Sequence, residues 1–302
     1  MAKKVLIIGN GLDLGFGLKT SYSDFSKSNE WKDLYKGVSR WRDNLANALR
    51  REASKKNWFD VENCILEYAE RKSREKSIGY VDYDREFFES LKRKLNQYLW
   101  KPAIESIADE GIAIHFCKTF FDNRCFDEVY TFNYTPLDFL LVNSDCDIDV
   151  PNHIATHLHN MLDDNIILGI NEDADVLPEY DFLKKVNNMN YHGTNIIRDL
   201  REANEIVIYG HSLNKIDFGY FKDLFLNSTQ NSRHGERHIT IITKDRESAE
   251  QIKSNLQHNG ADLTVLISVD RLEFIMVEQM TDSRFDSEKM KYEALLSRLI
   301  HH

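Results

Sequence analysis

The sequence opens with a run of large apolar residues, Val5–Ile8, followed directly by the glycine-rich turn Gly9–Gly11. An unbroken apolar run of this length is typical of a strand buried on both faces of a parallel sheet. Glycines behind such a strand let backbone N–H groups approach a ligand, and a following helix N-terminus favours phosphate. The pattern is not a complete G-x-G-x-x-G fingerprint, because Leu14 stands where the third glycine should be. The turn indicates a nucleotide-type ligand; the alternative is a turn whose glycines serve backbone shape alone.

The amino-acid composition argues for a soluble protein and against several other classes. The chain has 302 residues, of which 42% are hydrophobic and 29% charged, as in an ordinary soluble protein. Its net charge of −10 argues against a broad nucleic-acid or membrane surface, although a local basic site stays compatible with it. There is no signal-peptide pattern and no apolar run near the ~20 residues of a membrane helix. The four cysteines show no C-x-x-C spacing, so we expect a reduced, cytoplasmic protein without a zinc module.

The first part of the chain is dominated by helical patterns. Residues 39–122 form a block dense in charge, with a long helix expected over 82–107 and a shorter one opening at Trp58 to Glu62. We interpret this block as an insertion between the first and second strands of a single α/β domain spanning residues 1–302. Its charged surface indicates a solvated helical face, and the alternative is a surface for a partner or for nucleic acid.

Strand and helix patterns alternate in the rest of the chain. This alternation predicts a doubly wound, mainly parallel sheet of the Rossmann kind. The expected strands are 127–135, 153–158, 165–170, 205–209, 238–243 and 263–269, and the expected helices are 137–142, 195–203, 217–226, 246–258 and 287–300.

Four unusual clusters each follow a predicted strand. Ligands of such sheets bind at the carboxyl ends of the strands, near the point where strand order reverses. Core packing does not explain these clusters, and their shared edge points to one binding site. They are Gly9-Asn10-Gly11 with Asp13, Thr131–Thr135 with Asn133, His157 with His159, and Gly210-His211-Ser212.

Each candidate also has a structural alternative. The Asn133 amide suits a ribose hydroxyl or a water, but asparagine at a strand end is often a turn former. Alternation places His157 and His159 on one face of a strand, where His159 suits a general base and either ring could be structural. We predict no metal, because no third ligand stands at a recognisable spacing. Ser212 could cap the next helix or bind phosphate, and Asp217 could cap that helix or contact the ligand.

The order of these motifs resembles that of the AbiH family of bacterial phage-defence proteins. The resemblance extends over about residues 4–222 and implies a role in abortive infection, in which the infected cell stops growing or dies before phage release. It implies little about chemistry. The motifs that carry it are Gly9–Leu14, Gly17–Phe25, Trp58 with Asp60 and Glu62, Thr131–Thr135, His157 with His159, and Gly210–Leu213 with Asp217.

A more distant resemblance is to sirtuin-like NAD-binding domains. Those domains have a glycine turn followed by a second glycine motif, which matches Gly9–Asp13 and then Gly17–Thr20 here. The resemblance implies that Asn133 binds ribose, that His159 is the catalytic histidine and that Gly210–Ser212 contacts the cofactor. Two positions depart from the sirtuin pattern, Thr135 in place of an aspartate and Asn160 in place of a glycine.

The resemblances together imply NAD hydrolysis rather than protein deacetylation, because the four-cysteine zinc module is missing. Asn133 would position the attacking water, His159 would accept a proton, and Asp13 would stabilise an oxocarbenium-like centre. NAD is thus the expected ligand or substrate. The alternatives are a nucleotide-sensing module acting through a partner, and a nuclease or RNA-targeting toxin using Asp60 and Glu62 with a metal. Homo-oligomerisation stays open.

Overall fold

The computed structural model describes residues 3–55, 60–105, 111–143, 154–162, 165–191, 194–227, 237–280 and 286–300. The chain forms two compact units. We call the first, Met1–Gly17 with Ile107–Leu158 and Thr194–His302, the sheet unit. The second, Leu18–Ser106 with His159–Gly193, is the helical unit. A single domain over 1–302 stays a prediction.

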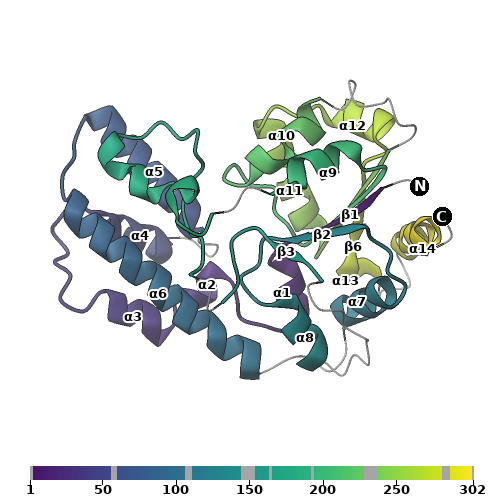
Figure 1. The fold of residues 1–302 in the computed structure, drawn as a ribbon, viewed down its shortest axis with the longest axis horizontal. Coiled ribbons are helices and arrows are strands. Elements are labelled where there is room, and N and C mark those ends of the chain that lie inside the picture. The colour runs from purple at the N-terminus through teal and green to yellow at the C-terminus, as the bar shows by residue number, and fades with distance from the viewer. Residues whose placement is uncertain are drawn as a thin grey trace. The chain divides into compact units, whose positions relative to one another are not determined.

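The sheet unit contains a six-stranded, fully parallel sheet in the order β3-β2-β1-β4-β5-β6 (Figure 1). In its register Leu6 of β1 pairs with Val129 of β2 on one side and with Val207 of β4 on the other. This arrangement confirms the doubly wound, Rossmann-like α/β fold. The strands are β1 (Lys4–Ile8), β2 (Glu128–Thr131), β3 (Thr156–His157), β4 (Glu205–Tyr209), β5 (His238–Thr243) and β6 (Glu273–Met276).

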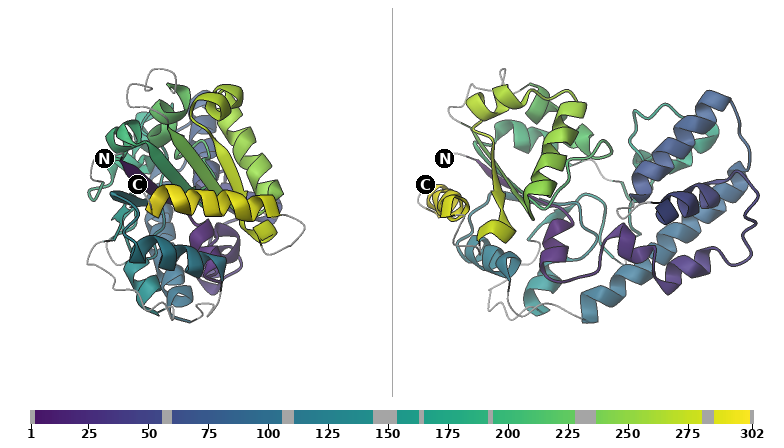
Figure 2. Two further views of the ribbon diagram at one scale, coloured as in Figure 1. Left: turned by 90° about the vertical axis from the view of Figure 1, so that its right-hand side faces the viewer. Right: turned by 180° about the vertical axis from the view of Figure 1, so that it is seen from behind.

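Helices cover both faces of the sheet, which explains the unbroken apolar run of β1 (Figure 2). Val5 and Ile7 join a core built with α9, α10, α11 and α12, and Leu6 and Ile8 are equally buried. Phe116 of α7 packs against Tyr209 of β4, with ring centroids 4.5 Å apart. The helices of this unit are α1 (Gly11–Gly15), α7 (Ile112–Asp122), α8 (Leu137–Asn143), α9 (Ile196–Glu202), α10 (Phe218–Leu226), α11 (Arg246–His258), α12 (Leu263–Val269), α13 (Val277–Met280) and α14 (Asp286–Ile300).

Three strand predictions need correction. Leu263–Val269 is the helix α12, because Asp262 accepts the N–H groups of Thr264 and Val265 and so caps a helix N-terminus. The last strand is instead β6, which the sequence analysis did not predict. The predicted strand 165–170 is irregular apart from an isolated bridge at Ile170, and strand 153–158 is reduced to the two residues of β3.

Three helices of the helical unit, α2, α3 and α5, have a side-chain cap at the N-terminus. Asp60 accepts the N–H of Asn63 and so begins α5. Ser28 does the same for Trp31 in α3. The elements are α2 (Tyr22–Phe25), α3 (Asn29–Leu34), α4 (Leu45–Lys55), α5 (Val61–Glu75), α6 (Val81–Glu105) and the 3-10 turns η1 (Pro178–Leu183) and η2 (Lys185–Asn187).

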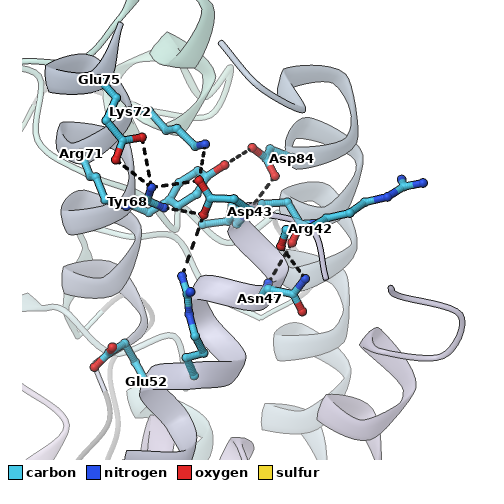
Figure 3. Close-up of polar contacts among 12 residues, drawn as sticks. Arg42, Asp43, Asn47, Glu52, Tyr68, Arg71, Lys72, Glu75 and Asp84 are labelled. Atoms are coloured by element: carbon cyan, nitrogen blue, oxygen red, sulfur yellow. Dashed lines mark hydrogen bonds and ion pairs between the residues drawn. The ribbon is translucent and has the colours of Figure 1, made fainter. Parts of the chain in front are cut away.

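Asp84 of α6 joins the elements of the helical unit (Figure 3). Its carboxylate accepts the N–H of Leu45 at 2.8 Å and the hydroxyl of Tyr68 at 2.5 Å. Tyr180 of η1 donates to the same carboxylate at 3.2 Å. Burial raises the pKa of Asp84, and these hydrogen bonds oppose that shift. Residues 178–183 thereby pack with α4, α5 and α6.

Some predicted features lie outside the described residues, namely Trp58, the end of the long helix at residue 107, and residue 153. Within the described ranges, no helix has the length and apolar character needed to cross a membrane.

Candidate functional site

Strand order reverses between β1 and β4, and the turns that follow these two strands pack directly on each other. The N–H of Gly9 donates to the Tyr209 carbonyl and the N–H of Gly11 to the Gly210 carbonyl, both at 2.9 Å. In open α/β sheets this reversal point is where ligands bind. The glycine clusters predicted from the sequence therefore do meet at the carboxyl edge of the sheet.

The glycines are required by this close approach. A Cβ at Gly11 would lie 2.5 Å from the Gly210 Cα, and a Cβ at Gly9 would lie 2.6 Å from the His211 Cα. Gly210 also has a φ of +63°, which L-residues rarely adopt. The N–H groups of Gly9 and Gly11 are used inside the protein, so the glycines serve backbone shape here and those two donors do not face a ligand.

Asp13 of α1 is the shared acceptor of a cluster of polar side chains at the carboxyl edge of the sheet, which we call the polar centre. One of its carboxylate oxygens accepts the Asn133 amide at 2.7 Å, and the other accepts the Thr135 hydroxyl at 2.7 Å. Asn133 Nδ2 also donates to the Gly9 carbonyl at 3.1 Å. All three side chains are buried. They connect the turn after β1 to the turn after β2.

His157, at the end of β3, contacts this centre through the Asn133 carbonyl, 3.0 Å from its Nδ1. A carbonyl only accepts, so Nδ1 carries the proton and Nε2 is the basic nitrogen of the neutral ring. Burial lowers the pKa of His157 from its usual value, while the bond to Asn133 opposes the shift. His157 is therefore a neutral imidazole with a fixed tautomer.

The cluster after β4 is organised by His211. Its Nδ1 accepts the N–H of Leu213 at 3.0 Å, and its Nε2 lies 3.6 Å from an Asp217 carboxylate oxygen. The ring packs against Phe132 at 4.3 Å. Asp217 stands at the N-cap of α10, yet its side chain makes no capping bond and faces His211 instead. Ser212 lies well before α10, so the idea that it caps this helix is wrong; its carbonyl accepts from Asn255.

His159 belongs to the helical unit. The prediction that His157 and His159 lie on one face of a strand is wrong, because β3 ends at His157. Its Nε2 lies 3.1 Å from Lys185 Nζ, and Lys185 lies 3.2 Å from a Glu62 carboxylate oxygen. The same oxygen of Glu62 accepts the N–H of Gly169 at 3.1 Å. Glu62, His159 and Lys185 are all buried. An ammonium is a donor only, so His159 Nε2 accepts from it.

The remaining predicted residues lie at the margins of these groups. Asn10 occupies the N-cap of α1, and Gly17 ends the turn after that helix with a φ of +82°. Thr20 is buried in the helical unit. Thr135 lies in the predicted cluster Thr131–Thr135, but its hydrogen bond to Asp13 was not predicted. Lys185 was not predicted to belong to a site, and it carries no local sequence signal.

The residues proposed for a metal-dependent nuclease have other contacts. Asp60 caps α5, and Glu62 pairs with Lys185. Across the described ranges, no group of three or more histidine, cysteine, aspartate or glutamate side chains is placed to hold a metal ion.

The fold is that of a doubly wound α/β protein, and its polar centre joins the turns after β1 and β2 at the carboxyl edge of the sheet, the edge at which this class binds its ligands. The family model described as Bacteriophage abortive infection AbiH matches residues 5–235. The chain belongs to the AbiH family. No curated protein matches the sequence. Family membership indicates a function in phage abortive infection.

Proposed function

We propose that this protein is an abortive-infection effector that binds NAD at the carboxyl edge of its sheet and hydrolyses the N-glycosidic bond to nicotinamide. The observation that carries the proposal is the strand order, with its reversal between β1 and β4. Beside that reversal stand Asp13, Asn133 and His157, joined in one hydrogen-bonded chain. The resemblance to sirtuin-like domains supplies the ligand class.

The reaction needs a base for water, and His157 meets the requirement better than His159. His157 is neutral and its Nε2 is the basic nitrogen, whereas Nε2 of His159 accepts from the buried Lys185 ammonium. In the proposed step, a water oxygen bonds to the ribose anomeric carbon and its proton passes to His157. The bond from that carbon to the pyridinium nitrogen breaks, and its electron pair leaves with neutral nicotinamide.

Asn133 and Asp13 have supporting roles in this scheme. The Asn133 amide nitrogen is engaged by Asp13 and the Gly9 carbonyl, so its Oδ1 is the atom that would accept from a ribose hydroxyl or from the water. The buried Asp13 carboxylate fixes Asn133 and contributes negative charge near a cationic transition state.

Nucleotide binding without turnover is a second candidate. Both Asp13 oxygens accept hydrogen bonds from within the protein, which suits a rigid binding site as well as a catalytic one. In that case the protein would sense a nucleotide and signal through a partner.

Nicotinamide release separates these functions. Purified protein would be incubated with NAD, with and without lysate of phage-infected cells, and His157→Asn and His159→Asn would be compared. We expect release by the wild type, a loss of about 100-fold or more in His157→Asn, and a smaller loss in His159→Asn. Tight NAD binding without release would favour the sensing function. Absence of both binding and release would exclude NAD as the ligand.

A further inference from the structure

Trp41 is the most exposed large apolar side chain described in the helical unit, with 96% of its surface in contact with solvent. It lies in the segment Ser39–Asp43, which precedes α4. Its neighbours Arg40 and Arg42 are also exposed. An indole held fully in water is costly, and tryptophan with arginine is a frequent combination at binding surfaces. This feature played no part in the site at the sheet edge.

The loop that carries Trp41 is fixed by one side chain. The Asn47 amide nitrogen donates to the Ser39 carbonyl and to the Arg42 carbonyl, each at 2.8 Å (Figure 3). These two carbonyls belong to residues that precede and follow Trp41 in the sequence. The tryptophan is therefore displayed by an ordered turn, and little conformational entropy would be lost when it contacts a ligand.

The end of the same loop is anchored by charge. Asp43 accepts a two-pronged contact from Arg71 at 2.8 and 2.9 Å, and Lys72 donates to it at 2.7 Å. Arg51 lies 3.9 Å from the same carboxylate. The contact with Arg71 holds the pKa of Asp43 below its usual value, so the group stays ionised. Arg71 also donates to the Glu75 carboxylate at 3.2 Å, so these three cations face two carboxylates and keep a net positive charge beside the loop.

A second aromatic ring stands beside the loop. The Arg42 guanidinium lies over the Tyr80 ring, 5.4 Å from its centroid, and Tyr80 is 43% exposed. The Arg42 side chain points away from the Asp43 network (Figure 3), so its charge is presented outward. We call Arg40, Trp41, Arg42 and Tyr80 the Trp41 surface.

We propose that the Trp41 surface binds single-stranded nucleic acid, with a base stacked on Trp41 and phosphates held by Arg40 and Arg42. Flat aromatic rings interleaved with arginines are how proteins bind single strands without reading sequence. The arginines are complementary to the polyanionic backbone even though the whole chain carries −10.

Exposure and charge favour nucleic acid over a protein partner here. At 96% exposure Trp41 leaves both faces of its ring open, as base stacking requires, whereas a protein hot spot is usually set in a surrounding apolar patch. The residues that border it are arginines. A small local surface of this kind predicts weak, salt-sensitive binding of a few nucleotides.

The test is fluorescence anisotropy with a fluorescein-labelled uridine oligonucleotide of about 12 nucleotides and its thymidine counterpart. Wild type, Trp41→Ala, Trp41→Phe and the double variant Arg40→Gln with Arg42→Gln would be titrated at about 50 and 200 mM salt. Met189→Ala and Arg93→Gln are matched controls, because both side chains are exposed in the helical unit outside the Trp41 surface. Thermal unfolding checks that every variant stays folded.

We expect Trp41→Ala to weaken binding by about 10-fold or more, Trp41→Phe to retain most of it, and the double arginine variant to lower the salt slope by about 1.4. The controls should bind as the wild type does. Absence of oligonucleotide binding at low salt, or equal binding by wild type and Trp41→Ala, would overturn the proposal. If Trp41→Ala abolishes phage defence in cells but leaves oligonucleotide affinity intact, the surface serves a protein partner and the proposal is likewise wrong.

Discussion

Asp13 and Asn133 lie 120 positions apart in the sequence and are joined by a hydrogen bond of 2.7 Å at the carboxyl edge of the sheet. Asp13 comes from the helix after β1 and Asn133 from the turn after β2. Through Asn133, the same chain of contacts reaches His157 after β3. The ends of three strands are thus held in one polar arrangement, which stabilises the sheet unit.

Replacing Asp13 should destabilise the protein strongly. Asp13→Ala leaves the Asn133 amide without one acceptor and the Thr135 hydroxyl without its carboxylate partner, in a buried place. We expect a loss of about 3 kcal/mol in the free energy of unfolding. Urea unfolding measures it. Asp138→Ala, at an exposed position in the first turn of α8, should change stability by less than about 0.5 kcal/mol.

The contact between the two glycine turns makes a steric prediction. Gly210→Ala places a methyl group 2.5 Å from the Gly11 Cα and imposes a positive φ on alanine, so we expect a loss of about 3 kcal/mol or a failure to fold. Gly219→Ala, on α10 with open space around its Cβ, should instead stabilise by about 0.5 to 1 kcal/mol. Thermal unfolding of the two variants, compared with the wild type, measures both effects. Equal effects would mean that the turns do not pack as described.

The buried ion pair of the helical unit should show coupling between its members. Lys185→Met strands the Glu62 carboxylate in the interior and should cost about 3 to 5 kcal/mol. Adding Glu62→Gln should restore part of this loss, because the unpaired charge is then removed. A double-mutant cycle in urea measures the coupling. Lys184→Met, which breaks a partly exposed pair with Asp181, should cost less than about 1 kcal/mol.

His157 makes the stability of the protein depend on pH. Burial lowers its pKa in the folded state below the 6.5 of the unfolded chain, so the unfolded chain binds the proton first as pH falls. The contribution is present above pH 6.5 and is lost as pH falls from 6.5 through the folded-state pKa. We expect the free energy of unfolding to fall progressively over this range in urea unfolding. His157→Gln should flatten that part of the profile, and an unchanged slope would contradict the assignment.

The fold could be predicted largely because its central strands are buried on both faces. The apolar runs at Val5–Ile8 and Glu205–Tyr209 have few alternatives, and Asp60 marks the start of α5 by its capping chemistry. The prediction of a strand over Leu263–Val269 was wrong, because a short apolar run suits a strand or a helix equally. Asp262 before it was the deciding signal, since its carboxylate caps α12.

The candidate site was harder to predict than the fold. Asp13, Asn133 and Gly210 each follow the carboxyl end of a strand. Because the strands are parallel, these residues lie at one edge of the sheet. The topology does not show which of these side chains contact each other. The two-residue length of β3 separates His157 from His159, and the partner of His159 is Lys185, which comes from a distant irregular segment. No local pattern around Lys185 indicates that it is buried.

Calorimetric titration with NAD tests the central claim most directly. Wild type would be compared with a double variant, Asn10→Ala with Ser212→Ala, which alters the two turns at the strand reversal while leaving the Asp13 centre and the Ser212 carbonyl in place. The account predicts saturable binding of NAD by the wild type and an affinity lowered about 10-fold or more in the variant, with thermal unfolding checking that the variant stays folded. Absence of binding by the wild type, or equal affinity in both proteins, would contradict a nucleotide site at this edge.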